Sequence, residues 1–279
     1  EDRRVADATT YGVGQLIAHA LKRGAERILL GLGGSATNDG GCSAAAALGV
    51  EFLDAEGKAF VPVGGTLRRI AHIRTDGLLP ALRQAEVIAM CDIDNPLCGE
   101  SGAAAVFAPQ KGADAATVRM LDEGLAHLAA VIEKDLGPSL LALPGGGAAG
   151  GFGAGSVAFL GARLQMGIEA VLDLTDFDRL AADAYLVITG EGRLDSQSLR
   201  GKVVVGVARR ARALGVPVVA LVGSSETDIA AAYDAGVTAV FPINPAPTTL
   251  SEALAHARTH LAFTAENVLR FARCLEENR

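Results

Sequence analysis

Apolar runs alternate with amphipathic runs in the C-terminal part of the chain, and this alternation restricts the fold more than any other feature. Residues 184–188, 216–222 and 238–241 have the length and composition of buried strands. Residues 203–214 and 228–234 lie between them and have helical spacing. Because strands joined through helices run parallel, the pattern predicts an α/β unit with a doubly wound parallel sheet. Three strands are few for such a sheet, so we expect it to be incomplete.

The preceding residues predict a second α/β domain. Helical spacing is present at residues 12–22, 39–48 and 115–133, strands are predicted at 27–32 and 85–91, and residues 51–58 predict a strand followed by a turn. A last amphipathic helix follows, with apolar side chains at Leu250, Leu254, Ala257, Leu261, Val268, Phe271 and Leu275. We expect this helix to pack against the sheet, with a homodimer seam as the alternative. The predicted domains are residues 1–175 and 176–279.

Composition excludes several classes of protein. The net charge of −7 argues against a general affinity for nucleic acid or anionic lipid, which both need a basic surface. The four cysteines have no Cys-x-x-Cys spacing, and they predict buried thiols rather than a disulfide framework. No apolar run approaches the ~20 residues of a membrane span, and no signal peptide opens the chain. We therefore expect a cytoplasmic enzyme that does not bind membranes or nucleic acid.

Two polar loops are predicted after the strands of the first domain. The loop at residues 31–41 is rich in glycine, so its backbone amides can approach a phosphate or carboxylate, and its candidate ligands are Gly33, Gly34, Ser35, Asn38 and Asp39. A tight turn with a helix cap is the alternative. The loop at residues 91–99 carries Asp92 and Asp94, candidate Mg²⁺ ligands or proton acceptors, and Asn95, a candidate substrate contact. These carboxylates alternatively cap the turn before Pro96.

A third glycine-rich loop is predicted at residues 145–155. Its Gly-x-Gly-x-x-Gly spacing resembles a dinucleotide fingerprint, but residues 140–144 make a poor preceding strand. A phosphate-cradling loop is the simpler interpretation, with Gly147, Gly150 and Gly151 as its backbone contacts.

A fourth loop, residues 189–202, lies between a predicted strand and a predicted helix. Ligands of open α/β sheets collect at the carboxyl ends of strands and at helix N-termini. The loop brings together Glu191, Arg193, Asp195, Ser198 and Lys202. Several carboxylates and cations in one loop suit phosphoryl transfer, which needs both kinds of group. The alternative is a solvent-exposed turn, which would explain each charged residue by itself.

Five segments together resemble the bacterial type I glycerate kinases: residues 31–41, 91–97, 106–112, 147–154 and 188–198. The resemblance implies ATP as co-substrate, Mg²⁺ as cofactor and D-glycerate as acceptor, and two α/β domains of which one is flavodoxin-like. With this reaction, we predict Asp195 as the general base or hydroxyl-orienting group. Arg193 and Lys202 are the predicted cations for carboxylate and phosphate groups, and Glu191 with Asp92 or Asp94 are the predicted metal ligands. Ser198 and the glycines of the first and third loops are implied in binding.

Other functions stay open at this point: a galactokinase-like kinase, a remnant that binds nucleotide or glycerate without turnover, and a dinucleotide-binding module. The family pattern opens with a strand and an Asp-Ser-Phe-Lys-Gly motif, and residues 1–279 contain neither this strand nor this motif. We therefore expect residues 1–279 alone to be poorly soluble or inactive, and to recover when that segment is restored.

Overall fold

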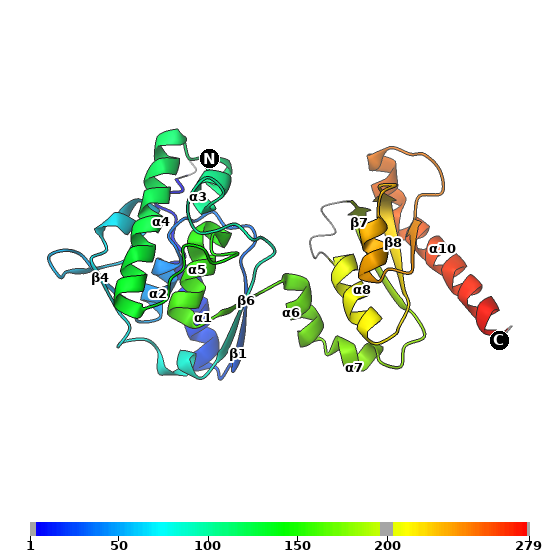
Figure 1. Ribbon diagram of the computed structural model, residues 1–279, viewed down its shortest axis with the longest axis horizontal. Helices are drawn as coiled ribbons and strands as arrows, with labels where there is room; N and C mark the ends of the chain where they lie inside the picture. The colour runs from blue at the N-terminus through cyan, green and yellow to red at the C-terminus, as the bar shows by residue number, and fades with distance from the viewer. Residues whose placement is uncertain (1–3, 196–202, 278–279) are drawn as a thin grey trace. The chain divides into compact units, whose positions relative to one another are not determined.

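The structure, a computed structural model, describes residues 4–195 and 203–277. The chain divides into two compact units, Glu1–Gly167 and Ile168–Arg279. Each unit combines helices with a three-stranded parallel sheet (Figure 1). The predicted α/β fold class is therefore confirmed.

A parallel sheet in the order β1-β5-β6 forms the centre of the first unit. Strands β1 (Arg27–Gly31) and β5 (Glu86–Met90) confirm two predicted strands, and β6 (Arg163–Gln165) pairs with β5. Val87, Ile88 and Ala89 are consecutive and all buried, so both faces of β5 are covered. This burial is typical of a central parallel strand between helices.

The first unit also contains helices and a small antiparallel sheet. The helices are α1 (Tyr11–Lys22), α2 (Cys42–Ala47), α3 (Ala103–Phe107), α4 (Ala115–Leu136) and α5 (Ala148–Leu160), with 3₁₀ helices η1 (Gly64–Arg69), η2 (Pro80–Arg83) and η3 (Pro109–Lys111). The small sheet has the order β3-β2-β4, formed by β2 (Glu51–Leu53), β3 (Ala59–Phe60) and β4 (His72–Arg74). The core is mostly Leu, Ile, Val and Ala, as a chain without tryptophan requires.

Helix α4 confirms the prediction at residues 115–133, whereas α2 begins later than predicted. Asp114 caps α4, its side chain accepting a hydrogen bond from the Thr117 amide, and Gly137 ends it with a positive φ of 99°. At the start of α2, Gly40 and Gly41 have φ values of 61° and 74°. Because these left-handed residues cannot continue a right-handed helix, α2 starts only at Cys42.

The glycine-rich segment predicted as a loop at residues 145–155 is a loop only in its first part: turns and left-handed backbone run to Gly151, and regular helix follows. Helix α5 runs from Ala148 to Leu160, with left-handed backbone at Ala149, Gly150 and Gly151. Its glycines lie against neighbouring backbone: a Cβ on Gly155 would lie 1.9 Å from the Gly40 carbonyl oxygen. Helix α5 is thus buried because its glycines let its backbone approach neighbouring backbone closely, without large side chains between them.

The second unit contains the predicted parallel sheet, in the order β7-β8-β9. Its elements are α6 (Gly167–Leu174), α7 (Phe177–Ala181), β7 (Val187–Leu194), α8 (Val203–Ala213), β8 (Val218–Ser225), α9 (Ala230–Ala235), β9 (Ala239–Pro242) and α10 (Leu250–Glu277). Side chains of α8 pack on the face of β8 that carries Val218 and Ala220. Val268 of α10 packs with Val219 and Leu221, which alternate onto the opposite face. Helices therefore pack on both faces of the central strand β8, as in a doubly wound fold.

Strand β7 extends through Leu194, so the segment 189–194 is not the loop that its glycines predicted. Residues Val187 to Leu194 pair in parallel register with Val218 to Ser225. A Cβ on Gly190 would lie 2.3 Å from the Leu221 carbonyl oxygen. The missing side chain therefore permits close approach to β8 rather than a turn.

The predicted C-terminal amphipathic helix is confirmed as α10, which runs on beyond the sheet of the second unit (Figure 1). Fewer of its apolar side chains are buried than predicted, since Leu250 and Phe271 are 76% and 65% exposed. Leu254, Ala257 and Leu261 line a groove of about 1070 Å³ with residues of β7 and β8. No helix within residues 4–195 and 203–277 is long and apolar enough to cross a bilayer.

Candidate active site

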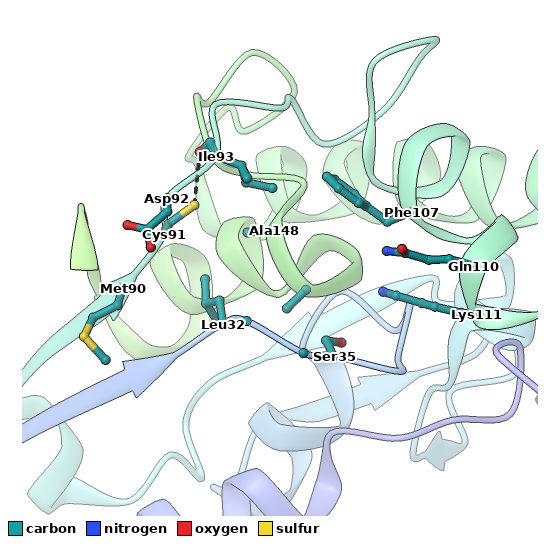
Figure 2. A pocket seen from close by; sticks show the side chains of 13 residues that line it. Leu32, Ser35, Met90, Cys91, Asp92, Ile93, Phe107, Gln110, Lys111 and Ala148 are labelled. Carbon is teal, nitrogen blue, oxygen red and sulfur yellow. Dashed lines mark hydrogen bonds between the residues drawn. The ribbon is translucent and has the colours of Figure 1, made fainter. Parts of the chain in front are cut away.

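A cavity of about 270 Å³ opens where β1 and β5 end, at the edge where α/β proteins bind their ligands. Its walls come from four segments far apart in the sequence: the ends of β1 and β5, the residues around η3, and the start of α5 (Figure 2). The lining residues are Leu32, Gly33, Gly34, Ser35, Met90, Cys91, Asp92, Ile93, Phe107, Gln110, Lys111, Ala148 and Ala149.

The first predicted loop has an open half and a packed half. Gly33 and Gly34 line the cavity, and a Cβ on either would meet no atom within 4 Å. Farther along, a Cβ on Gly40 would lie 2.4 Å from Leu128, and one on Gly41 would lie 2.3 Å from Phe152. The exposed backbone that could approach a ligand is therefore at residues 33–35, while residues 40–41 anchor the loop to the core.

Ser35 lies in the open half and is held by a local network. Its hydroxyl lies 2.9 Å from the Thr37 hydroxyl and accepts a hydrogen bond of 3.1 Å from the Thr37 amide. This serine turn orients the Ser35 oxygen beside the cavity (Figure 2).

Asp39 is fully buried beneath the loop and does not line the cavity. Its carboxylate accepts hydrogen bonds from the Thr10 amide and hydroxyl, both at 2.8 Å, and from the Gly41 amide at 3.1 Å. Burial raises the pKa of Asp39, and these hydrogen bonds oppose the rise. Asp39 therefore ties the start of α1 to the start of α2.

Asn38 is also fully buried, and its side-chain atoms have no hydrogen-bond partner among the described residues. Its Cα lies 2.5 Å from the position of a Cβ on Gly150. Like Asp39, it supports the loop from below, and a ligand contact for either residue stays a prediction.

The Lys111 side chain reaches the cavity from η3 and is only 9% exposed. Its Nζ donates a hydrogen bond of 2.7 Å to the Thr37 carbonyl oxygen. Burial lowers the pKa of Lys111, and the nearby Asp39 charge opposes that shift. Gln110 lies beside it, and both side chains point into the cavity (Figure 2).

The second predicted loop begins at the opposite end of the cavity (Figure 2). Asp92 lines the cavity, and its Oδ1 accepts a hydrogen bond of 2.7 Å from the Gly167 amide at the start of α6. Asp94 is exposed, and Asn95 donates from Nδ2 to the Ser101 carbonyl oxygen at 2.8 Å. Of these three predicted residues, Asp92 alone is among those that line the cavity.

The three predicted glycines of the third loop are buried at the start of α5. A Cβ on Gly147 would lie 2.3 Å from the Pro96 carbonyl oxygen, and one on Gly150 would lie 2.1 Å from that of Thr37. Gly151 faces Leu125 in the same way, at 2.7 Å. Turns rather than a strand precede α5, which removes the structural context of a dinucleotide fingerprint.

Strand β7 contains two predicted site residues of the second unit, Glu191 and Arg193, and Asp195 follows directly after its carboxyl end. Arg193 lies between two carboxylates: its Nη2 donates to Glu226 at 3.0 Å, and its Nε is 3.6 Å from Asp195. Glu191 and Arg193 line the groove beside α10. Ser198 and Lys202 lie outside the described residues.

Within residues 4–195 and 203–277, no group of three or more His, Cys, Asp or Glu side chains converges to hold a metal ion. Mg²⁺ commonly binds one or two carboxylates together with water and substrate phosphates. Asp92, Asp94 and Glu191 have the oxygen ligands that Mg²⁺ prefers, so their assignment stays a prediction.

The chain matches the model of the glycerate kinase family over residues 1–273. It belongs to the glycerate kinase family. It is 46% identical to a glycerate kinase of Halalkalibacterium halodurans, over 96% of this chain and 70% of the relative. It is 42% identical to glycerate 2-kinase of Escherichia coli K12, over 96% and 70% of the two chains. A crystal structure assigned to glycerate kinase 2 of Salmonella typhimurium LT2 has a TM-score of 0.85 and 43% identity, and the match covers 99% of this chain and 71% of that one.

Sequence analysis of this glycerate kinase family member missed Gln110 and Lys111 as site residues. Their segment, residues 106–112, contributed to the resemblance but was given no role. A signal was present: the pair lies between Pro109 and Gly112, where the chain is expected to turn. The distance in sequence between Lys111 and the loop at residues 33–37 concealed their contact.

Proposed function

We propose that this protein transfers the γ-phosphoryl group of ATP to a hydroxyl group of D-glycerate. The proposal rests on the family match, and the cavity at the ends of β1 and β5 supports it. The cavity offers the open backbone of Gly33 and Gly34 and the ammonium group of Lys111, which suit anionic substrates. We infer that the reaction takes place in the cytoplasm, which supplies ATP.

In the proposed reaction, the hydroxyl oxygen of glycerate forms a bond to the γ-phosphorus of ATP. The bond from that phosphorus to the bridging oxygen of ADP breaks, and the hydroxyl proton passes to the Asp195 carboxylate. Arg193 lies 3.6 Å from Asp195 and restricts the orientation of its carboxylate. Arg193 and Lys202 are the proposed catalytic cations, and Ser198 is a proposed binding residue.

The carboxylates available for Mg²⁺ are Asp92 and Asp94 in the first unit and Glu191 in the second. Their oxygens fit a hard cation, which would neutralise charge on the phosphates of ATP. Gly147, Gly150 and Gly151 stay proposed backbone contacts, although each is packed against protein atoms.

Release of ADP by the complete natural protein, in purified form, tests this proposal. We expect ADP only when ATP, D-glycerate and Mg²⁺ are all present, complete loss on chelation with EDTA, and recovery with excess Mg²⁺. Turnover on a sugar without turnover on glycerate would instead indicate another small-molecule kinase. Calorimetric binding of D-glycerate or ATP without ADP release would indicate a binding protein that has lost its activity.

A further inference from the structure

The Lys111 ammonium group is buried and forms no ion pair with a described residue, although the charge of buried Asp39 acts on it. An ammonium group has three N–H donors, and the hydrogen bond that the structure records for it is donated to the Thr37 carbonyl. Among the described residues, no carboxylate lies within 4.0 Å of its Nζ to form an ion pair. Burial of a charge is costly unless that charge is paired. A cavity that holds such a group is therefore prepared for an anionic ligand.

The size and lining of the cavity indicate which ligand this is. Its volume of about 270 Å³ is just below the ~300–1,000 Å³ typical of sites for drug-sized ligands. A three-carbon acid fits within such a space. Leu32, Ile93 and Phe107 supply apolar walls that suit a short carbon chain.

We infer that Lys111 binds the carboxylate of the hydroxy-acid substrate and thereby selects an anionic acceptor over a neutral polyol. The inference rests on the proposed glycerate kinase reaction. Gln110 and Ser35 lie close by and can donate hydrogen bonds to the same carboxylate (Figure 2).

Lys111 also borders a neighbouring cavity of about 590 Å³, which Arg4, Gly34 and Ser35 line as well. The test must therefore separate a role toward the acid from a role toward the phosphates of ATP. Lys111→Met removes the charge and keeps the length of the side chain. Lys111→Arg keeps the charge, and Lys58→Met removes an exposed lysine as the matched control.

We expect Lys111→Met to raise KM for D-glycerate and to weaken its calorimetric Kd by about 10- to 100-fold, as loss of a charge-assisted hydrogen bond implies. KM for ATP should change by less than about threefold, because the lost hydrogen bond is inferred to bind the acid and not the nucleotide. Lys111→Arg should recover part of the loss, and Lys58→Met should behave as wild type. Thermal unfolding checks that each variant is folded.

Glyceramide, the neutral amide of glycerate, supplies a readout that a purely structural role of Lys111 would not affect. The wild-type protein should strongly prefer glycerate to glyceramide, and Lys111→Met should lose most of that preference. A wild-type protein that accepts both equally overturns the inference even if the variant does not fold. A rise confined to KM for ATP overturns it as well. Wild-type turnover of glycerate with an unchanged Lys111→Met variant refutes this inference alone, whereas wild-type protein without binding or turnover of glycerate refutes the proposed function too.

Discussion

Replacement of Gly150 by alanine tests whether the glycines of α5 exist to let the loop at residues 33–41 approach. Gly150 has a φ of 66° and a ψ of 40°, a left-handed conformation that costs a residue with a side chain about 1–2 kcal/mol. A Cβ there would also lie 2.1 Å from the Thr37 carbonyl oxygen and 2.5 Å from the Asn38 Cα. To reach a normal contact distance, these backbones must separate by about 1 Å or more.

Overpacking of a closely packed interior typically costs a further 1–3 kcal/mol, so Gly150→Ala should lower the free energy of unfolding by about 2–5 kcal/mol. Gly161 is the matched control at the other end of the same helix. Its φ of 62° is nearly the same, but a Cβ there would meet no atom within 4 Å. Gly161→Ala should therefore cost only about 1–2 kcal/mol, from backbone strain.

Urea unfolding followed by far-UV circular dichroism measures both variants, since the chain contains no tryptophan. Hydrogen exchange supplies a local readout, because the Gly40 amide donates to the Gly150 carbonyl oxygen at 3.1 Å. We expect faster exchange of this amide in Gly150→Ala only. The reasoning is refuted if the two variants unfold with free energies that agree within about 0.5 kcal/mol, which is less than any overpacking cost.

Two further changes test the carboxylates. Asp195→Asn removes the proposed proton acceptor and keeps its shape, so kcat should fall by about 100-fold or more with little change in stability. The control Asp234→Asn changes an exposed carboxylate and should leave kcat unchanged. A near-normal kcat in Asp195→Asn would exclude the role of Asp195 as the base. For Asp39, burial raises the folded-state pKa above its ordinary value of 3.8, so the folded protein binds this proton more tightly than the unfolded chain does. The stability of the wild type relative to Asp39→Asn should therefore fall as pH rises from about 3.8 through the raised pKa, which urea unfolding between pH 4 and pH 8 measures. A difference that is constant, or that increases with pH, would contradict the assigned burial effect.

The secondary structure was predictable where side chains set the period. Helices α4 and α10 and strands β1, β5 and β8 have the apolar spacing that burial on one or two faces requires. Glycine misled the prediction at residues 152–155, which are helical, and at residues 189–194, which form a strand. In both segments glycine permits close contact with a neighbouring backbone, whereas its usual meaning in a sequence is a turn.

The segments that form the candidate site were predictable from the sequence, but which of their side chains face the cavity was not. The polar loops at residues 31–41 and 91–99 were predicted to follow strands, and Gly33, Gly34, Ser35 and Asp92 of these loops line a common cavity. Asn38 and Asp39 belong to the same loop but point beneath it, because Asp39 binds Thr10. The orientation of a polar residue depends on the partner it meets, and that partner is distant in sequence.

The sequence alone determined the α/β class, the order of strands and helices in the second unit, and the family, because periodicity and local motifs are written in neighbouring residues. The tertiary structure alone decided that α5 is a buried helix and that Asp39 is a structural anchor. It also placed the Lys111 ammonium group beside Thr37, 74 residues away in the chain. The physical reason is that burial, charge pairing and backbone approach depend on contacts between distant segments, which local spacing does not specify.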